Sequence, residues 1–284
     1  MEDDKKSTYT YEYPRPSLTA DCVVFSFDGN DLKVLLIERG LEPFKGKWAF
    51  PGGFMRMDET IEECAKRELQ EETGLVETRL EQFHVFSDVN RDPRVDSFGN
   101  PVRVVTVAFF ALVKQSEVNG GDDAKNAKWF SMKDIPHLAF DHDYILRLAQ
   151  RALKEKICFE PIGFDLMDQE FTIPDLQRLY EAILEVKFDR RNFQKKILQT
   201  GILNDVDVRD EIIPYEISDS PNSYLNEKLC KKDIRTLFEP RVSYYAIADY
   251  DDEKNSVGRK PKKFTFNKMQ YEAMKQPGKF KLEF

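Results

Sequence analysis

The sequence predicts an α+β fold in its first half, built from a mixed sheet and two helices, and a smaller helical domain after it. Three observations lead to this expectation. At 284 residues the chain exceeds the usual size of a single domain. Runs rich in β-branched and aromatic residues are mixed with two helix-periodic stretches as far as residue 156. Two short amphipathic helices then follow Phe171 in tandem.

The elements of the first half are marked by apolar runs with turn residues between them. We expect strands at residues 18–27, 33–38, 78–87, 102–113 and 129–130, and helices at 60–72 and 141–156. The turn Asp28-Gly29-Asn30-Asp31 predicts a hairpin, and residues 48–50 lead into the glycine turn Pro51-Gly52-Gly53. The run VRVVTVAFFALV at 102–113 is almost continuously apolar, which predicts a central strand.

The most specific stretch is GFMRMDETIEECAKRELQEETGL, which runs from Gly53 to Leu75. Helical spacing places Glu68, Glu71 and Glu72 at i, i+3 and i+4, on one turn near the helix C-terminus. These charges repel one another, and the helix dipole disfavours negative charge at this end. A bound cation makes the arrangement favourable, and carboxylate ligands suit Mg²⁺ or Mn²⁺.

The spacing of this stretch resembles the Nudix box. The resemblance implies a Nudix-type α/β/α sandwich and metal-dependent hydrolysis of a nucleoside diphosphate linked to another group. The implied metal ligands are Gly53 (through its carbonyl), Glu68, Glu71 and Glu72, and the implied catalytic residues are Glu59, Arg67, Glu71 and Glu72. We expect Arg67 to pair with Glu59 or a metal-binding glutamate, and Gly74 to end the helix in a left-handed cap. The general base stays open among Glu71, Glu117, Asp122 and Asp123.

Three segments outside the box indicate the substrate class. Residues 87–94 resemble a loop of ADP-ribose-processing Nudix proteins, because Pro93 follows Leu75 by 18 positions. An Asp-Pro pair is also a common turn, so this segment alone does not decide the substrate. The segments 121–124 and 138–142 resemble the same subfamily in the same order. The expected substrate-binding residues are Phe54, Arg91, Pro93, Arg94 and Asp122, whereas His142 is expected to start a helix or to pack in the core.

The second half begins with two helices that carry their own start signals. Thr172 is expected to cap the first helix, with Pro174 in its opening turn, and Asp189 to cap the second. The second helix buries Phe193 and Ile197 and presents a basic and polar face that suits the major groove of DNA. A basic turn at 258–266 resembles the wing of a winged helix. The expected DNA-binding residues are Arg190, Arg191, Gln194, Lys195, Arg259 and Lys260.

The order of these parts resembles the Nudix-related, NrtR-like transcriptional regulators of NAD metabolism. The resemblance implies a flexible arm at residues 1–17, a Nudix domain at 18–160 and a winged helix-turn-helix-like domain at 161–284. It also implies binding and hydrolysis of ADP-ribose or a related metabolite, together with binding to double-stranded DNA. An insert at about 204–257, acidic at first, departs from the pattern and would oppose DNA binding. Two alternatives stay open: a non-catalytic regulator that senses ADP-ribose or a sugar, and a plain hydrolase whose second domain does not bind DNA.

Composition narrows the class further. The net charge of −8 argues against a nonspecific polyanion binder, and the acidity lies mainly in the first half. No apolar run is long enough to cross a membrane, and the N-terminus has no apolar leader, so we expect a cytoplasmic protein. The 4 cysteines are scattered and are expected to be free thiols. A homodimer would suit palindromic DNA.

Overall fold

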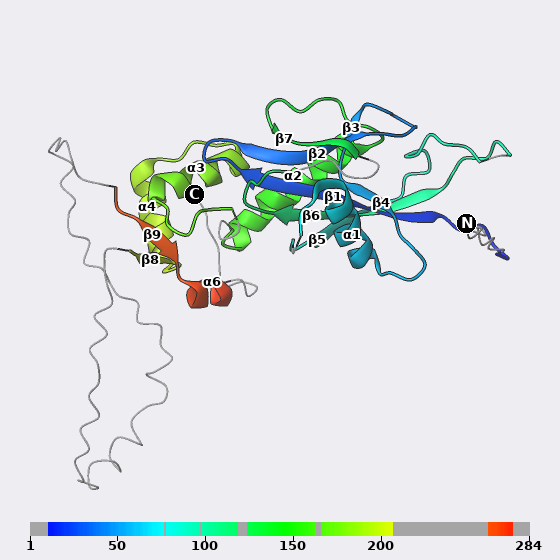
Figure 1. The fold of residues 1–284 in the computed structure, drawn as a ribbon. Coiled ribbons are helices and arrows are strands. Elements are labelled where there is room, and N and C mark those ends of the chain that lie inside the picture. The colour runs from blue at the N-terminus through cyan, green and yellow to red at the C-terminus, as the bar shows by residue number, and fades with distance from the viewer. Residues whose placement is uncertain are drawn as a thin grey trace, which may run out of the picture.

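The computed structural model describes residues 11–76, 78–96, 98–118, 124–162, 166–206 and 261–274 (Figure 1). The first part of the chain contains β1 (Ser17–Phe27), β2 (Leu32–Arg39), β3 (Trp48–Ala49), β4 (Gly52–Phe54), α1 (Ile61–Thr73), β5 (Glu81–Phe86), β6 (Val104–Leu112), β7 (Ala124–Ser131) and α2 (His142–Phe159). The second part contains α3 (Ile173–Leu184), α4 (Arg190–Gln199), β8 (Leu203–Asp205), β9 (Phe264–Phe266) and α6 (Lys268–Met274). Three predicted site residues, Asp122, Arg259 and Lys260, lie outside the described residues.

The first part forms one mixed sheet, as the sequence predicts. The strands follow the order β3-β2-β1-β6-β5, while β4 pairs with β1 and β7 pairs with β2. β1 and β6 are parallel, from Ser17 opposite Val104 to Phe25 opposite Leu112. The other pairs in the sheet are antiparallel. β6 therefore lies between two strands, which confirms the central position that its apolar run predicts.

Helices cover both faces of this sheet. Because side chains alternate along β1, Cys22 and Val24 point to one face and pack in the cluster that includes Leu69 of α1. Val23 and Phe25 point to the other face and pack in the cluster that includes α2. The α/β/α layering is confirmed. One element was predicted too short: β7 has 8 residues, because it pairs along most of β2.

The second part is a helix–helix–hairpin unit. Thr172 and Asp175 form a capping box at the start of α3, and the Asp189 side chain accepts a hydrogen bond from the backbone N–H of Asn192 at the start of α4. β8 and β9 pair antiparallel as the hairpin of a winged helix. The predicted insert begins in β8, at Asn204 and Asp205, and the rest of it falls in the connection between the two strands of the wing. The predicted winged helix-turn-helix-like architecture is confirmed.

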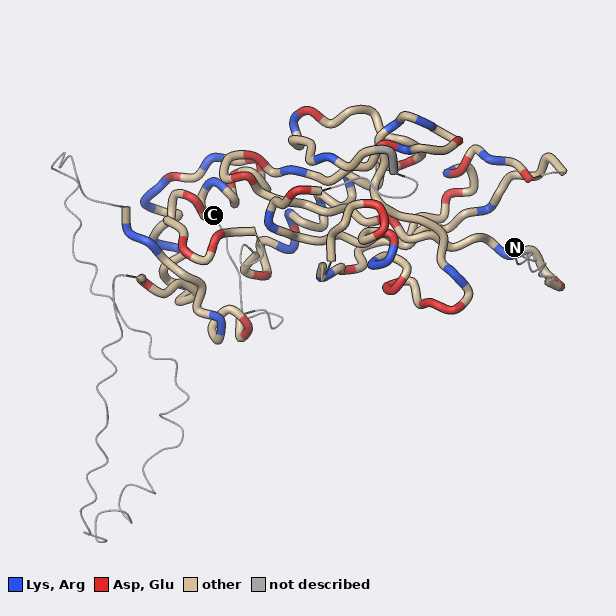
Figure 2. Tube along the Cα trace, in the orientation of Figure 1, with Lys and Arg blue, Asp and Glu red and all other residues tan. Residues whose placement is uncertain are grey.

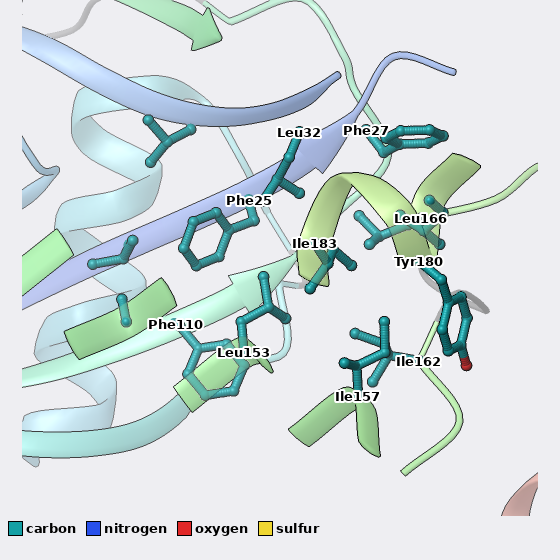
Figure 3. Close-up of a cluster of buried hydrophobic side chains, with 14 of the residues drawn as sticks. Phe25, Phe27, Leu32, Phe110, Leu153, Ile157, Ile162, Leu166, Tyr180 and Ile183 are labelled. Atoms are coloured by element: carbon teal, nitrogen blue, oxygen red, sulfur yellow. The ribbon is translucent and has the colours of Figure 1, made fainter. Parts of the chain in front are cut away.

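The two parts share a single apolar core (Figure 3). Leu153 and Ile157 of α2 lie in the same buried cluster as Tyr180 and Ile183 of α3. Phe25, Phe27 and Leu32 from the ends of β1 and β2 belong to it too. At its edge, Arg178 of α3 donates a hydrogen bond to the carbonyl of Gly29 at 2.9 Å. No helix in the described ranges has both the length and the apolar character needed to cross a membrane.

Candidate functional site

The site begins at the glycine turn between β3 and α1. A Cβ atom on Gly52 would lie 2.2 Å from the carbonyl oxygen of Ala20, and one on Gly53 would lie 2.4 Å from the carboxylate of Glu68. Neither position has room for a side chain. The turn therefore brings the backbone of β4 directly against β1 on one side and against the acidic face of α1 on the other.

The box helix has well-defined ends, of which the sequence analysis predicted the Gly74 cap. Thr60 and Glu63 form a capping box at the N-terminus of α1. At the other end, Gly74 adopts the left-handed conformation with φ 76°, and its N–H donates a hydrogen bond to the carbonyl of Gln70. These caps fix the length of the helix, and so they fix which carboxylates face the glycine turn.

Arg67 donates hydrogen bonds to three carboxylates of the Gly53–Leu75 stretch. Its guanidinium donates to Glu59 at 2.9 and 2.7 Å, to Glu68 at 2.6 Å and to Glu71 at 3.0 Å. The hydrogen bonds from Arg67 are the main reason that the pKa of Glu59 falls to about 2, and they raise the pKa of Arg67 itself. The predicted pairing of Arg67 with Glu59 is present, and it extends to two of the proposed metal ligands.

Glu72 lies in the interior and makes a different contact. Its side chain accepts a hydrogen bond from the backbone N–H of Gly52 at 2.8 Å, and only 7% of the residue is exposed. Burial is the main reason that the pKa of Glu72 rises to about 8; the hydrogen bond from Gly52 opposes this rise, and the nearby charges of Glu68 and Asp21 contribute to it. Burial also raises the pKa of Glu68. Two adjacent carboxylates in such surroundings are stabilised by added positive charge.

The fit of a divalent cation to this donor set is partial. Glu68 and Glu72 both lie against the turn and offer the hard oxygen atoms that Mg²⁺ and Mn²⁺ prefer. Arg67 donates hydrogen bonds to both Glu68 and Glu71. Within the described part of the chain, no cluster of three or more His, Cys, Asp or Glu side chains is arranged to hold a metal ion. The residues nearest the turn are thus Glu68, Glu72 and the Gly53 carbonyl, and Glu68 and Glu71 would both offer the cation a carboxylate that Arg67 already binds.

A buried polar network lies beside the turn, and sequence reasoning missed its central member, Asp21. The carboxylate of Asp21 accepts a hydrogen bond from Thr106 at 2.7 Å and lies 3.6 Å from Arg91 and 3.7 Å from the His142 ring. It also borders Gly52, where a Cβ would come within 2.9 Å of it. A single acidic residue within the apolar strand at 17–27 was the available signal.

The predicted substrate-binding residues separate into two groups. The side chain of Arg91 is only 7% exposed and forms a bidentate pair with Asp141, at 3.0 and 2.8 Å, so its guanidinium lies in the interior. Arg94 pairs with Asp92 and lies 5.2 Å above the ring of Phe54, which is 44% exposed. Pro93, which lies between Arg91 and Arg94 in the sequence, is exposed. Phe54 and Arg94 are therefore the two that the fold brings together at the surface.

His142 and Arg39 complete the surroundings of the site. His142 is the first residue of α2, is 4% exposed and stacks on Phe50, so it both starts a helix and packs in the core. Burial lowers its pKa. Arg39, at the end of β2, donates to the carbonyl of Pro43 at 2.9 Å and lies 4.8 Å above the ring of Phe140. No sequence motif indicated that Arg39 would lie beside the site.

The second part presents a basic helix. Phe193 and Ile197 of α4 are buried, as predicted, and Phe193 packs on Tyr180 with 5.7 Å between ring centroids. The predicted DNA-binding residues of this helix, Arg190, Arg191, Gln194 and Lys195, are all exposed. Figure 2 shows Lys and Arg along the C-terminal helices and at the start of β9. The basic residues beside β9 are paired, since Lys263 lies 2.9 Å from Glu170 and Lys262 contacts Asp205.

The first part, a mixed sheet with the acidic helix α1 on one face, has the architecture of a small-molecule site. The second part, two helices followed by a wing, has the architecture of a nucleic-acid-binding domain. Together they define a two-part protein. Residues 15–149 match the NUDIX domain family, and residues 163–212 match the NrtR DNA-binding winged helix domain family. The chain belongs to the Nudix family, in the NrtR-type arrangement of a Nudix domain fused to a winged helix domain.

Two relatives and one solved structure illustrate this family assignment. The "ADPR responsive transcriptional repressor NtrR" of Acinetobacter baylyi is 33% identical over 204 residues, which cover 69% of this chain and 78% of that protein. The "ADP-ribose pyrophosphatase" of Methanocaldococcus jannaschii is 39% identical over 135 residues, 48% of this chain and 73% of the relative. Shewanella oneidensis NrtR, crystallised with a 27mer DNA, has the same fold, with a TM-score of 0.62 at 23% identity over 94% of this chain and 99% of that one. Nudix hydrolases generally use divalent metal cations.

Proposed function

We propose that the Nudix domain binds ADP-ribose or a related nucleoside diphosphate-linked metabolite and cleaves its pyrophosphate in the presence of Mg²⁺ or Mn²⁺. We further propose that the winged helix binds double-stranded DNA, so that the metabolite regulates DNA binding. The observation that carries the proposal is the pair of carboxylates, Glu68 and Glu72, held against the Gly52–Gly53 turn in a chain related to ADP-ribose-responsive and ADP-ribose-cleaving proteins.

The residues of the site have distinct roles in this proposal. A bound divalent cation would polarise the phosphoryl oxygens and would lower the pKa of the attacking water. Glu68, Glu72 and the Gly53 carbonyl would hold it, and Arg67 would orient the carboxylates through its hydrogen bonds. Arg94 and the exposed ring of Phe54 would contact the metabolite, with the guanidinium meeting phosphate and the ring meeting a base or sugar.

Product analysis tests the catalytic part. We expect the purified chain to release AMP from ADP-ribose only when Mg²⁺ or Mn²⁺ is present, and chelation by EDTA to stop the release. High-performance liquid chromatography of the reaction mixture measures AMP directly. If a panel of nucleoside diphosphate derivatives stays uncleaved with either metal, the hydrolase proposal is wrong.

A second candidate is a sensor that binds the metabolite without cleaving it. The contacts of Arg67 favour it, because a guanidinium already neutralises Glu68 and Glu71, two of the carboxylates that a metal needs. Isothermal titration with ADP-ribose separates the two candidates. Metal-independent binding without AMP release identifies a sensor, whereas metal-dependent release identifies the hydrolase.

The double substitution Arg190→Ala/Arg191→Ala tests the proposed DNA interface. Both side chains are exposed at the start of α4, where arginines can reach phosphates and base edges. We expect the affinity for a duplex selected by the wild-type protein to fall by about 10- to 100-fold, and the salt slope of binding to decrease by about 2. Fluorescence anisotropy at several salt concentrations measures both quantities.

The matched control is Arg147→Ala/Arg151→Ala on α2, which removes the same charge from the first domain. The side chain of Arg151 is 75% exposed and pairs with Glu155, one turn further along the same helix. We expect this control to bind DNA like the wild type. Equal losses in the two double variants would show that net charge, rather than α4, determines DNA affinity.

A further inference from the structure

The N-terminus of α2 is attached to the candidate site by side chains. Asp141, directly before the helix, accepts two hydrogen bonds from Arg91, at 3.0 and 2.8 Å. His142 accepts a hydrogen bond from the backbone N–H of Phe50 at 3.0 Å, and its ring stacks on Phe50 with 5.1 Å between centroids. Arg91 also lies 3.6 Å from Asp21, which borders the glycine turn. The first turn of α2 therefore belongs to the wall of the site.

The other end of α2 lies in the core that the two domains share. The helix has 18 residues, so it is about 27 Å long. Leu153 and Ile157 in its last turns are buried in one cluster with Tyr180 and Ile183 of α3 (Figure 3). α3 in turn packs on α4, through Tyr180 and Phe193. A rigid helix thus joins the Nudix site to the helix pair that carries the basic face, and close packing transmits small displacements along it.

Asp141 has two competing uses at this junction. It is the N-cap residue of α2, a position at which aspartate normally accepts a hydrogen bond from the helix backbone. Thr60, Thr172 and Asp189 make that bond at the starts of α1, α3 and α4. Asp141 makes no side-chain cap hydrogen bond, and its carboxylate is turned to Arg91 instead. Of the first four N–H groups of α2, those of His142, Tyr144 and Ile145 donate to the carbonyls of Ala139 and Asp141. Among the described residues the N–H of Asp143 has no such acceptor, and the Asp141 carboxylate could serve it.

We propose that Asp141 exchanges partners when the Nudix domain binds its ligand. In the ligand-free protein it pairs with Arg91; an anionic ligand takes over Arg91, and Asp141 then caps α2. Since only 7% of the Arg91 side chain is exposed, the ligand reaches it only when the loop that carries it moves, and that movement breaks the pair. The change in the first turn of α2 is passed to α3 and α4. This inference rests on the proposed function, because it needs a phosphate-bearing ligand and DNA.

The test variant is Asp141→Ser, because serine caps a helix but cannot form an ion pair with Arg91. DNA affinity is measured by fluorescence anisotropy on the full chain, with and without ADP-ribose, in EDTA to prevent turnover. The ligand-free variant is expected to match the DNA affinity of the ADP-ribose-saturated wild type within about twofold, and added ADP-ribose is expected to change it by less than about twofold. ADP-ribose itself is expected to bind the variant at least as tightly as it binds the wild type.

The matched control is Asp143→Ser. Its carboxylate lies on the same turn but contacts His137 and the backbone of Leu138 rather than Arg91. This control is expected to keep the wild-type response. Asp141→Asn, which also caps without a charge, must reproduce the serine result. Circular dichroism melting verifies that each variant is folded.

The outcomes separate this inference from the proposed function. A wild-type protein that responds to ADP-ribose, together with an Asp141→Ser variant that responds equally, overturns the exchange alone. A wild-type protein whose DNA binding ignores ADP-ribose rejects the regulatory part of the proposed function and the exchange with it. If the chain binds no DNA, amide hydrogen exchange in α3 reports the coupling directly, and exchange that is the same with and without ADP-ribose overturns it.

Discussion

Replacing Glu72 by glutamine is expected to reduce Mg²⁺-dependent AMP release by at least about 10²-fold, equivalent to about 3 kcal/mol of transition-state stabilisation. The substitution keeps the shape of the side chain and its acceptor for the Gly52 N–H, but it removes the negative charge beside the turn. The control is Glu62→Gln, an exposed carboxylate on the first turn of α1, which is expected to stay active. Full activity in Glu72→Gln would show that the metabolite is cleaved elsewhere.

The same variant is expected to be more stable than the wild type in the absence of metal. Burial raises the pKa of Glu72 from 4.5 to about 8, so the unfolded carboxyl ionises first as pH rises. The folded wild type therefore loses stability between about pH 4.5 and pH 8, whereas glutamine does not titrate. At pH 8 in EDTA the variant is expected to gain on the order of 2–4 kcal/mol in unfolding free energy, and at pH 4 almost none. Urea titrations at the two pH values measure this difference, and equal gains at both would contradict the assigned pKa.

Truncating Ile157 to alanine is expected to destabilise both domains together. The side chain is fully buried in the cluster that joins α2 to α3, and such truncations cost about 2–5 kcal/mol. Both tryptophans, Trp48 and Trp129, lie in the Nudix domain, while far-UV circular dichroism also reports α3 and α4. We expect the two signals to change at one urea concentration, because a shared core unfolds cooperatively.

The control for this prediction is Phe159→Ala, on the same helix but 57% exposed, which is expected to change stability by less than about 1 kcal/mol. Separate transitions for tryptophan fluorescence and circular dichroism in the wild type would show that the domains unfold independently. In that case the core in Figure 3 would be an ordinary contact between two stable units.

Local signals allowed much of the fold to be predicted from the sequence. The predicted capping residues Thr172 and Asp189 act within three residues of themselves, and Gly74 ends its helix by its own backbone conformation. Such signals do not depend on the rest of the chain, so they can be read directly. The metal-type carboxylates were also recognisable, since helical spacing alone places them on one turn.

The remaining parts of the site depend on segments that are distant in sequence. Arg91 meets Asp141 across 50 positions, and Phe50 meets His142 across 92. Asp21 became part of the site only because β4 folds back on β1. No local pattern specifies such contacts, which is why the pairing of Arg91 with Asp141 was not predicted. The position of the insert within the wing needed the pairing of β8 with β9 in the same way.

The parallel pairing of β1 with β6 has a consequence for synthesis of the chain. β1 leaves the ribosome first, yet its partner from Val104 to Leu112 emerges only much later, so the centre of the sheet closes late. The far end of β1 also supplies Phe25 and Phe27 to the core on which α3 packs. The winged helix of the growing chain therefore packs against residues of β1, and these residues are fixed in place only after β1 has paired with β6. Because these residues are shared, we expect the winged helix to complete its packing only after the Nudix sheet has closed.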